Sequence, residues 1–180
     1  MEKQTVSKQT DLNIYEGRAW LFGDNVDTDN IFPTRFGADA TPQEMGTHVF
    51  IDFRPDFNRE AREGDIVVAG WNFGYGSYRE TAATGLRARG IQVIVARSFA
   101  RAYYRNAVNL GMFPLSIGEA ELDFAEGDAA AVDLEAGTLT NRRTGSVVAC
   151  IVPGGLEAEI IRAGGATSYF RPLVVHKLQA

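Results

Sequence analysis

The stretch that decides the fold is Val67-Val68-Ala69-Gly70-Trp71-Asn72-Phe73-Gly74-Tyr75-Gly76-Ser77-Tyr78-Arg79-Glu80. Its apolar start predicts a buried strand, Gly74 and Gly76 predict a turn, and a helical pattern follows. A glycine-rich turn lets the backbone approach a ligand closely, and the amides of a helix start favour bound negative charge. We therefore expect an anion pocket here, with Ser77 and Arg79 on its rim.

The segments around this turn predict an α/β fold. Strands are expected at residues 18–22, 65–69 and 91–96, and helices from Thr41, after Gly76 and from Ser98 to Gly111. Two strand-to-helix units in succession, joined by short links, favour a parallel sheet covered by helices. Residues 50–64 lack periodicity, so we expect a long loop there.

The second half of the chain has a different pattern. Short strands are expected at residues 131–134, 138–140 and 146–152, and a helix at residues 156–163. The tail 167–180 is too apolar to be free, whereas residues 1–12 are polar and are expected to form a flexible N-terminal tail. We therefore expect a single α/β domain over residues 1–180, with a mostly parallel sheet, flanking helices and a β-rich C-terminal half.

Composition limits the kinds of partner. The formal net charge is -5 and the pI is near 5.1, whereas nucleic acids and anionic membranes select basic faces. We see neither the apolar core of a secretion signal nor the length of a membrane span. The expectation is a cytoplasmic protein that binds a small anion, and neither nucleic acid nor a membrane.

The chain offers few ligands for a metal. Cys150 is the single cysteine, and the apolar run around it predicts a core thiol in a buried strand. One cysteine cannot hold an iron–sulfur cluster, and His48 and His176 lack ligand spacing. The acidic loop 24–30 lacks the glutamate and the glycine of an EF-hand. Any metal that the protein uses is therefore expected to come largely from elsewhere.

A dinucleotide site is a weaker interpretation of the glycine turn. Strand, Gly-x-Gly and helix occur in the right order, but the third glycine is absent. The next strand ends at Arg97 rather than at an acidic residue for a ribose, which leaves only a 2′-phosphate as a possible ligand. A plain surface turn is the other alternative.

Three motifs follow one another over roughly residues 18–116. They are Asp27-Thr28-Asp29-Asn30-Ile31 with Pro33, then Asn72-Phe73-Gly74-x-Gly76-Ser77-x-Arg79-Glu80, then Ala96-Arg97-Ser98-Phe99-Ala100-Arg101 with Asn106, Asn109-x-Gly111 and Pro114. Together they resemble the small subunit of 3-isopropylmalate dehydratase, which is similar to the swivelling domain of aconitase. The fold that the resemblance implies is an aconitase swivelling-type domain.

The resemblance implies a hydro-lyase divided over two chains, acting on a malate-type 2-hydroxy di- or tricarboxylic acid, as in leucine biosynthesis. In that family the large subunit carries a [4Fe-4S] cluster on three cysteines, and the small subunit closes over the substrate. The iron without a protein thiolate acts as a Lewis acid. The implied partner is therefore a cluster-bearing large subunit, and this chain itself is expected to hold no cofactor.

The resemblance also assigns roles within the site. Ser77 matches the family's catalytic base, whose alkoxide needs backbone amides and a guanidinium nearby. Arg79 matches the arginine that binds a substrate carboxylate with two donors, and Asp29 matches an aspartate at the same site. Gly74 and Gly76 belong to the substrate-binding turn.

The resemblance implies that the substrate is selected by the loop that corresponds to residues 33–39. Arg35 is a candidate for pairing with a second or third carboxylate, and Phe36 for packing against a branched alkyl group. A plain surface arginine is the alternative. Isopropylmalate, homocitrate-like and methylated malate substrates therefore all stay open.

Three positions depart from the family pattern. Tyr78 stands where a second serine is usual, Thr81 where a histidine is usual, and Tyr75 where the residue is smaller or acidic. A substrate contact at Tyr78 is therefore altered or lost, while the expected base and arginine are kept. A paralogue for another 2-hydroxy acid stays open, as does a non-catalytic anion or nucleotide sensor.

Overall fold

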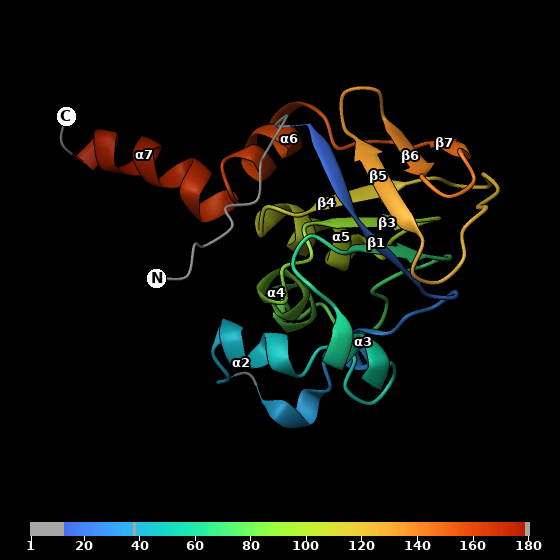
Figure 1. Cartoon of the computed structure of the whole chain (residues 1–180). Coiled ribbons are helices and arrows are strands. Elements are labelled where there is room, and N and C mark those ends of the chain that lie inside the picture. The colour runs from blue at the N-terminus through green and yellow to red at the C-terminus, as the bar shows by residue number, and fades with distance from the viewer. Residues whose placement is uncertain (1–12, 38, 179–180) are drawn as a thin grey trace, which may run out of the picture.

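The computed structural model describes residues 13–37 and 39–178 (Figure 1). Within them, one seven-stranded sheet has the order β4-β3-β2-β1-β5-β6-β7. Its strands are β1 (Ile14–Leu21), β2 (Ile66–Ala69), β3 (Val93–Ala96), β4 (Phe113–Ser116), β5 (Ala129–Asp133), β6 (Thr138–Asn141) and β7 (Val147–Ala149). The helices are α1 (Thr28–Ile31), α2 (Pro42–Thr47), α3 (Pro55–Glu60), α4 (Thr81–Ala88), α5 (Arg101–Asn109), α6 (Gly155–Arg162) and α7 (Ala166–Leu178), with a 3-10 turn, η1 (Thr34–Phe36).

The sheet has a parallel half and an antiparallel half that meet at β1. Strands β1 to β4 pair in parallel, whereas β5, β6 and β7 continue from β1 in antiparallel fashion. All residues of β2 and β3 are buried, as parallel strands covered on both faces require. The predicted fold class is therefore confirmed, including the β-rich C-terminal half.

The core forms two clusters, one on each face of the parallel strands. Val67 packs with Phe57 and Leu86 of α3 and α4, whereas its neighbour Val68 packs with Leu139 and Ile160. Successive strand residues point to opposite faces, so a continuous apolar run supplies both clusters. Figure 1 shows α2, α3 and α4 together on one side of the strands.

The two helices that follow β2 and β3 begin later than the sequence predicts. Helix α4 begins at Thr81 rather than directly after the glycine turn, and α5 begins at Arg101 rather than at Ser98. The Phe73 amide donates to Ser98 O, and the Ala100 amide donates to Phe73 O, each at 2.9 Å. This pairing keeps residues 98–100 extended and delays the helix.

The expected loop at residues 50–64 is wrong in part, because α3 lies within it. Pro55 occupies the first turn of α3, where a fixed φ and a missing amide cause no loss. Phe57 is fully buried against Trp20, with ring centroids 5.0 Å apart. Tertiary packing of one aromatic side chain therefore stabilises a helix of six residues that shows no sequence periodicity.

The C-terminal part differs from expectation in two details. Cys150 follows β7 rather than lying in it and is half-buried, although burial still raises the pKa of its thiol to about 11. The apolar tail forms α7, which extends away from the sheet (Figure 1) and leaves Phe170 and Val174 exposed. No helix in the described part of the chain is long and apolar enough to cross a membrane. The expected N-terminal tail at residues 1–12 lies outside the described residues.

Candidate functional site

The candidate site is built by two loops that leave β1 and β2 at their carboxyl ends. The amide of Thr28 donates to Tyr75 O, and the amide of Gly74 donates to Val26 O, both at 2.8 Å. Because β1 and β2 are parallel neighbours, both loops emerge at the same edge of the sheet. The acidic loop and the glycine turn therefore lie side by side.

Glycine is required at both positions of the turn. Gly74 has φ +77° and Gly76 has φ +100°, in the region that other residues rarely adopt. A Cβ at Gly74 would lie 2.2 Å from Cγ of Tyr103, and a Cβ at Gly76 would lie 2.9 Å from Oδ2 of Asp27. The turn thus passes closely over α5 on one side and the acidic loop on the other.

Ser77 is half-buried at the end of this turn and is held from two directions. Its amide donates to Thr28 Oγ1 at 2.9 Å, and its own Oγ accepts from the Arg79 amide at 3.2 Å. The amide at the hydroxyl therefore comes from the turn and not from the start of α4, which corrects the expected source. A serine that bonds an amide two residues ahead competes locally with helix formation.

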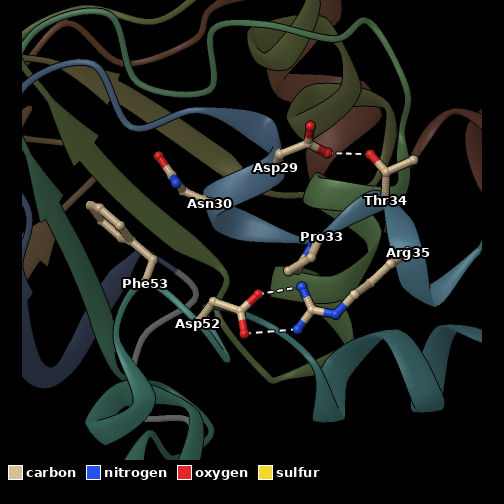
Figure 2. A pocket seen from close by; sticks show the side chains of 7 residues that line it. All are labelled: Asp29, Asn30, Pro33, Thr34, Arg35, Asp52 and Phe53. Carbon is tan, nitrogen blue, oxygen red and sulfur yellow. Dashed lines mark hydrogen bonds and ion pairs between the residues drawn. The ribbon is translucent and has the colours of Figure 1, made fainter.

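Arg79 and Asp29 are brought together by Thr34, which we did not predict as a site residue. Arg79 Nη1 lies 3.4 Å from Thr34 Oγ1, and the Thr34 hydroxyl donates a short hydrogen bond to the Asp29 carboxylate (Figure 2). The backbone at Asp29 is fixed by Asp27, whose Oδ1 accepts a hydrogen bond from the Asp29 amide at 2.6 Å. The result is a polar chain from the glycine turn to the acidic loop.

A cavity of about 390 Å³ opens beside these hydrogen-bonded side chains. Its lining comes from the acidic loop, the residues after it and the segment before α3, and Figure 2 shows these side chains around it. They are Asp29, Asn30, Pro33, Thr34, Arg35, Asp52 and Phe53. Among the predicted site residues, Asp29 and Arg35 line this cavity, whereas Ser77 and Arg79 do not. The Arg79 side chain is connected to the cavity through Thr34, and Ser77 is linked to Arg79 by the amide of that residue.

Arg35 does not present a free guanidinium to the cavity. Its Nη1 and Nη2 donate to the two carboxylate oxygens of Asp52 at 2.5 and 2.7 Å (Figure 2). These hydrogen bonds raise the pKa of Arg35 and lower the pKa of Asp52. Asp52 lies 17 residues along the chain, and no local pattern in the sequence signals this contact.

Phe36 lies behind Arg35 rather than in the cavity. The Arg35 guanidinium is 4.5 Å from the centroid of the Phe36 ring, and that ring packs 3.9 Å from the ring of His48. Phe36 therefore supports the arginine, and the apolar lining of the cavity comes from Pro33 and Phe53.

Tyr78 lies at the surface of the glycine turn. It is 85% exposed, and only its carbonyl is held, by Asn106 Nδ2 at 3.2 Å. Its phenol is thus available at the rim of the turn and makes no contact with Ser77 or Arg79 among the described hydrogen bonds. The Tyr78 side chain therefore does not help to hold the glycine turn in its conformation.

The described residues do not form a metal centre. No group of three or more His, Cys, Asp or Glu side chains among them could hold a metal ion. Cys150 lies on the antiparallel side of the sheet, beyond β7 and away from the acidic loop. The side chains of the described residues therefore do not fit an iron–sulfur cluster.

Fold and site together define a class of protein. It is an α/β domain with a candidate site at the carboxyl edge of its parallel strands, where an acidic loop meets a glycine–serine turn. Residues 18–120 match the family model described as the aconitase C-terminal domain. The chain belongs to this family, and the resemblance seen in its motifs is confirmed.

Similar proteins carry more specific names. The chain is 43% identical over 165 residues to the 3-isopropylmalate dehydratase small subunit of Aquifex aeolicus, covering 91% of this chain and 98% of that protein. It is 39% identical over 158 residues to the methanogen homoaconitase small subunit of Methanocaldococcus jannaschii, covering 88% and 92%. A crystal structure of 3-isopropylmalate dehydratase from the same archaeon superposes with a TM-score of 0.86 at 36% identity, covering 92% of this chain and 98% of that one.

Proposed function

We propose that this chain is the small subunit of a two-chain hydro-lyase that removes water from a malate-type 2-hydroxy acid. The observation that carries the proposal is a series of hydrogen bonds that ends at the cavity. The Arg79 amide donates to Ser77 Oγ, the Arg79 guanidinium donates to Thr34, and the Thr34 hydroxyl donates to Asp29. The proposal is supported by the names of the relatives, which are small subunits of such dehydratases.

Ser77 is proposed as the base that takes a proton from the carbon next to the hydroxyl-bearing carbon. A hydroxyl becomes a base only where positive potential stabilises its alkoxide. The Arg79 amide already donates to Ser77 Oγ at 3.2 Å, and the guanidinium of the same residue reaches Thr34 Oγ1 at 3.4 Å. If the Ser77 hydroxyl loses its proton, the Arg79 amide is already in place to donate a hydrogen bond to the alkoxide.

Arg79 is proposed to bind one substrate carboxylate. Its side chain is exposed, and its described side-chain contact is a long hydrogen bond of 3.4 Å to Thr34. A planar guanidinium offers a carboxylate two parallel donors, which fixes the orientation of the substrate. Asp29 is proposed to orient Thr34, so that this hydroxyl and Arg79 meet the substrate in one geometry.

The proposal requires a partner that carries the iron–sulfur cluster. The described residues cannot hold that group, whereas the relatives are named as subunits of larger enzymes. A large subunit facing the carboxyl edge of the sheet would complete the cavity. In this proposal the large subunit supplies the cluster, and the residues of this chain bind the substrate and remove the proton.

The test is reconstitution. The chain is expressed together with a cluster-bearing large subunit, the complex is purified without oxygen, and the absorbance of unsaturated acids is followed across a panel of substituted malates. The proposal predicts turnover by the complex and none by the isolated chain. Tight binding of an anion or nucleotide by the isolated chain, together with an inactive complex, would instead support a sensor.

A further inference from the structure

The cavity beside Asp29 has an unusual balance of charge for a site of carboxylic acids. Its lining contains two carboxylates, Asp29 and Asp52, and one guanidinium, that of Arg35. The remaining lining residues are uncharged. With all three groups ionised, a third substrate carboxylate would enter a cavity that already carries net negative charge.

Asp52 occupies the edge of Arg35 that a ligand would use. Each terminal nitrogen of the guanidinium donates a hydrogen bond to one oxygen of the aspartate, at 2.5 and 2.7 Å. This is the two-pronged geometry that a substrate carboxylate would need. Phe36 lies against one face of the same guanidinium at 4.5 Å. The Arg35 side chain is still 56% exposed, so it is the paired charge and the occupied donors, rather than burial, that set Arg35 apart from a free cation.

The backbone segment that carries Asp52 is held by the core, although the Asp52 side chain itself is 54% exposed. Phe50, two residues earlier, is fully buried with φ +55° and stacks on Phe22 at 4.4 Å between ring centroids. The Phe50 amide donates to Ile31 O at 2.8 Å, which ties this segment to α1 of the site. A bulky residue with positive φ is retained only where its surroundings fix it, so the aspartate is presented from a fixed backbone.

The uncharged part of the lining suits an alkyl group. Pro33 and Phe53 both line the cavity, and 44% of Phe53 is exposed. A branched alkyl substituent would remove this apolar surface from water. A carboxylate in the same place would lose its water without gaining a free cation.

We propose that Asp52 is a specificity-determining residue, which neutralises Arg35 so that the cavity accepts a hydroxy acid with an alkyl substituent and rejects one with a third carboxylate. This inference rests on the proposed function. It assigns Arg35 the task of holding Asp52 and the cavity wall in place, and it makes the substrate a dicarboxylic acid with an uncharged side chain.

The test compares two acids in the reconstituted complex. 3-Isopropylmalate supplies the alkyl substituent, homocitrate supplies the third carboxylate, and kcat and KM are measured separately for each. The wild-type complex is expected to prefer the alkyl acid. In Asp52→Asn, the ratio of kcat/KM for the two acids is expected to move toward homocitrate by about tenfold or more, mainly through KM, because a contact made before and during reaction changes binding uniformly.

The matched controls separate charge at this position from charge or stability in general. Asp56→Asn removes an aspartate of the same chain that pairs with Arg54 at 2.8 Å outside the cavity, and it is expected to leave the ratio unchanged. Asp52→Glu keeps the charge and is expected to keep the wild-type preference. Adding Arg35→Gln to Asp52→Asn is expected to cancel the gain for homocitrate.

Two results would overturn the inference while the proposed function stands. One is a wild-type complex that turns over homocitrate better than 3-isopropylmalate. The other is an active Asp52→Asn complex whose ratio stays within about twofold of the wild type; Asp52→Ser replaces this variant if it does not assemble. A wild-type complex that dehydrates no hydroxy acid at all would overturn the proposed function together with the inference.

Discussion

Replacing Gly74 with alanine tests how closely the glycine turn passes over α5. Alanine at φ +77° costs about 1–2 kcal/mol from backbone strain alone. The new Cβ would also lie 2.2 to 2.5 Å from three atoms of Tyr103, which is only 1% exposed and cannot swing away. Overpacking of this kind adds about 1–3 kcal/mol. The expected loss in the free energy of unfolding is therefore about 2–5 kcal/mol.

Gly145 provides a control with the same backbone and no neighbour. Its φ is +78°, and a Cβ there would meet nothing within 4 Å. Gly145→Ala is therefore expected to cost only the backbone strain of about 1–2 kcal/mol. Urea unfolding of the full chain, followed by circular dichroism, measures both variants. Equal losses for the two, within about 0.5 kcal/mol, would refute the close approach of the turn to Tyr103.

Three further predictions concern other groups. Arg79→Lys is expected to raise the KM of the reconstituted complex about tenfold with a smaller change in kcat, because a point charge cannot replace a two-pronged contact. Arg54 lowers the pKa of Asp56 to about 2, so its ion pair stabilises the fold above the ordinary pKa of 3.8 and loses this effect as pH falls through 2. Urea unfolding should accordingly show Asp56→Asn to be less stable than wild type at pH 7, by under about 1 kcal/mol, with the difference shrinking as pH falls. Because burial raises the pKa of Cys150 to about 11, iodoacetamide should modify the folded chain at pH 8 slower than the urea-unfolded chain by on the order of a hundredfold.

The parallel half of the fold is readable from sequence because its strands are buried on both faces. Residues 66–69 and 93–96 are continuous apolar runs, and Gly90 and Gly111 mark the ends of the helix that follows each of them. The starts of α4 and α5 are less readable. The start of α5 depends on pairing between the segments after β2 and β3, a contact between residues about 26 positions apart that no local pattern encodes.

The same distinction applies to the site. The glycine turn, Ser77, Arg79 and Asp29 belong to local motifs, and the structure places their loops side by side. Thr34 and Asp52 become visible only in three dimensions, because each acts through a partner far along the chain. The sequence therefore indicates where the candidate site lies, and the fold is needed to see that Arg35 is already paired with Asp52.

The central claim is that Ser77 removes the proton from the substrate, and Ser77→Ala in the reconstituted complex tests it most directly. The account predicts a fall in kcat of about 10²-fold or more, with unchanged assembly by size-exclusion chromatography. Ser146→Ala is the matched control, since Ser146 is also half-buried but lies at the β6–β7 turn, and it should keep full activity. A Ser77→Ala complex with kcat within about threefold of wild type would contradict the account.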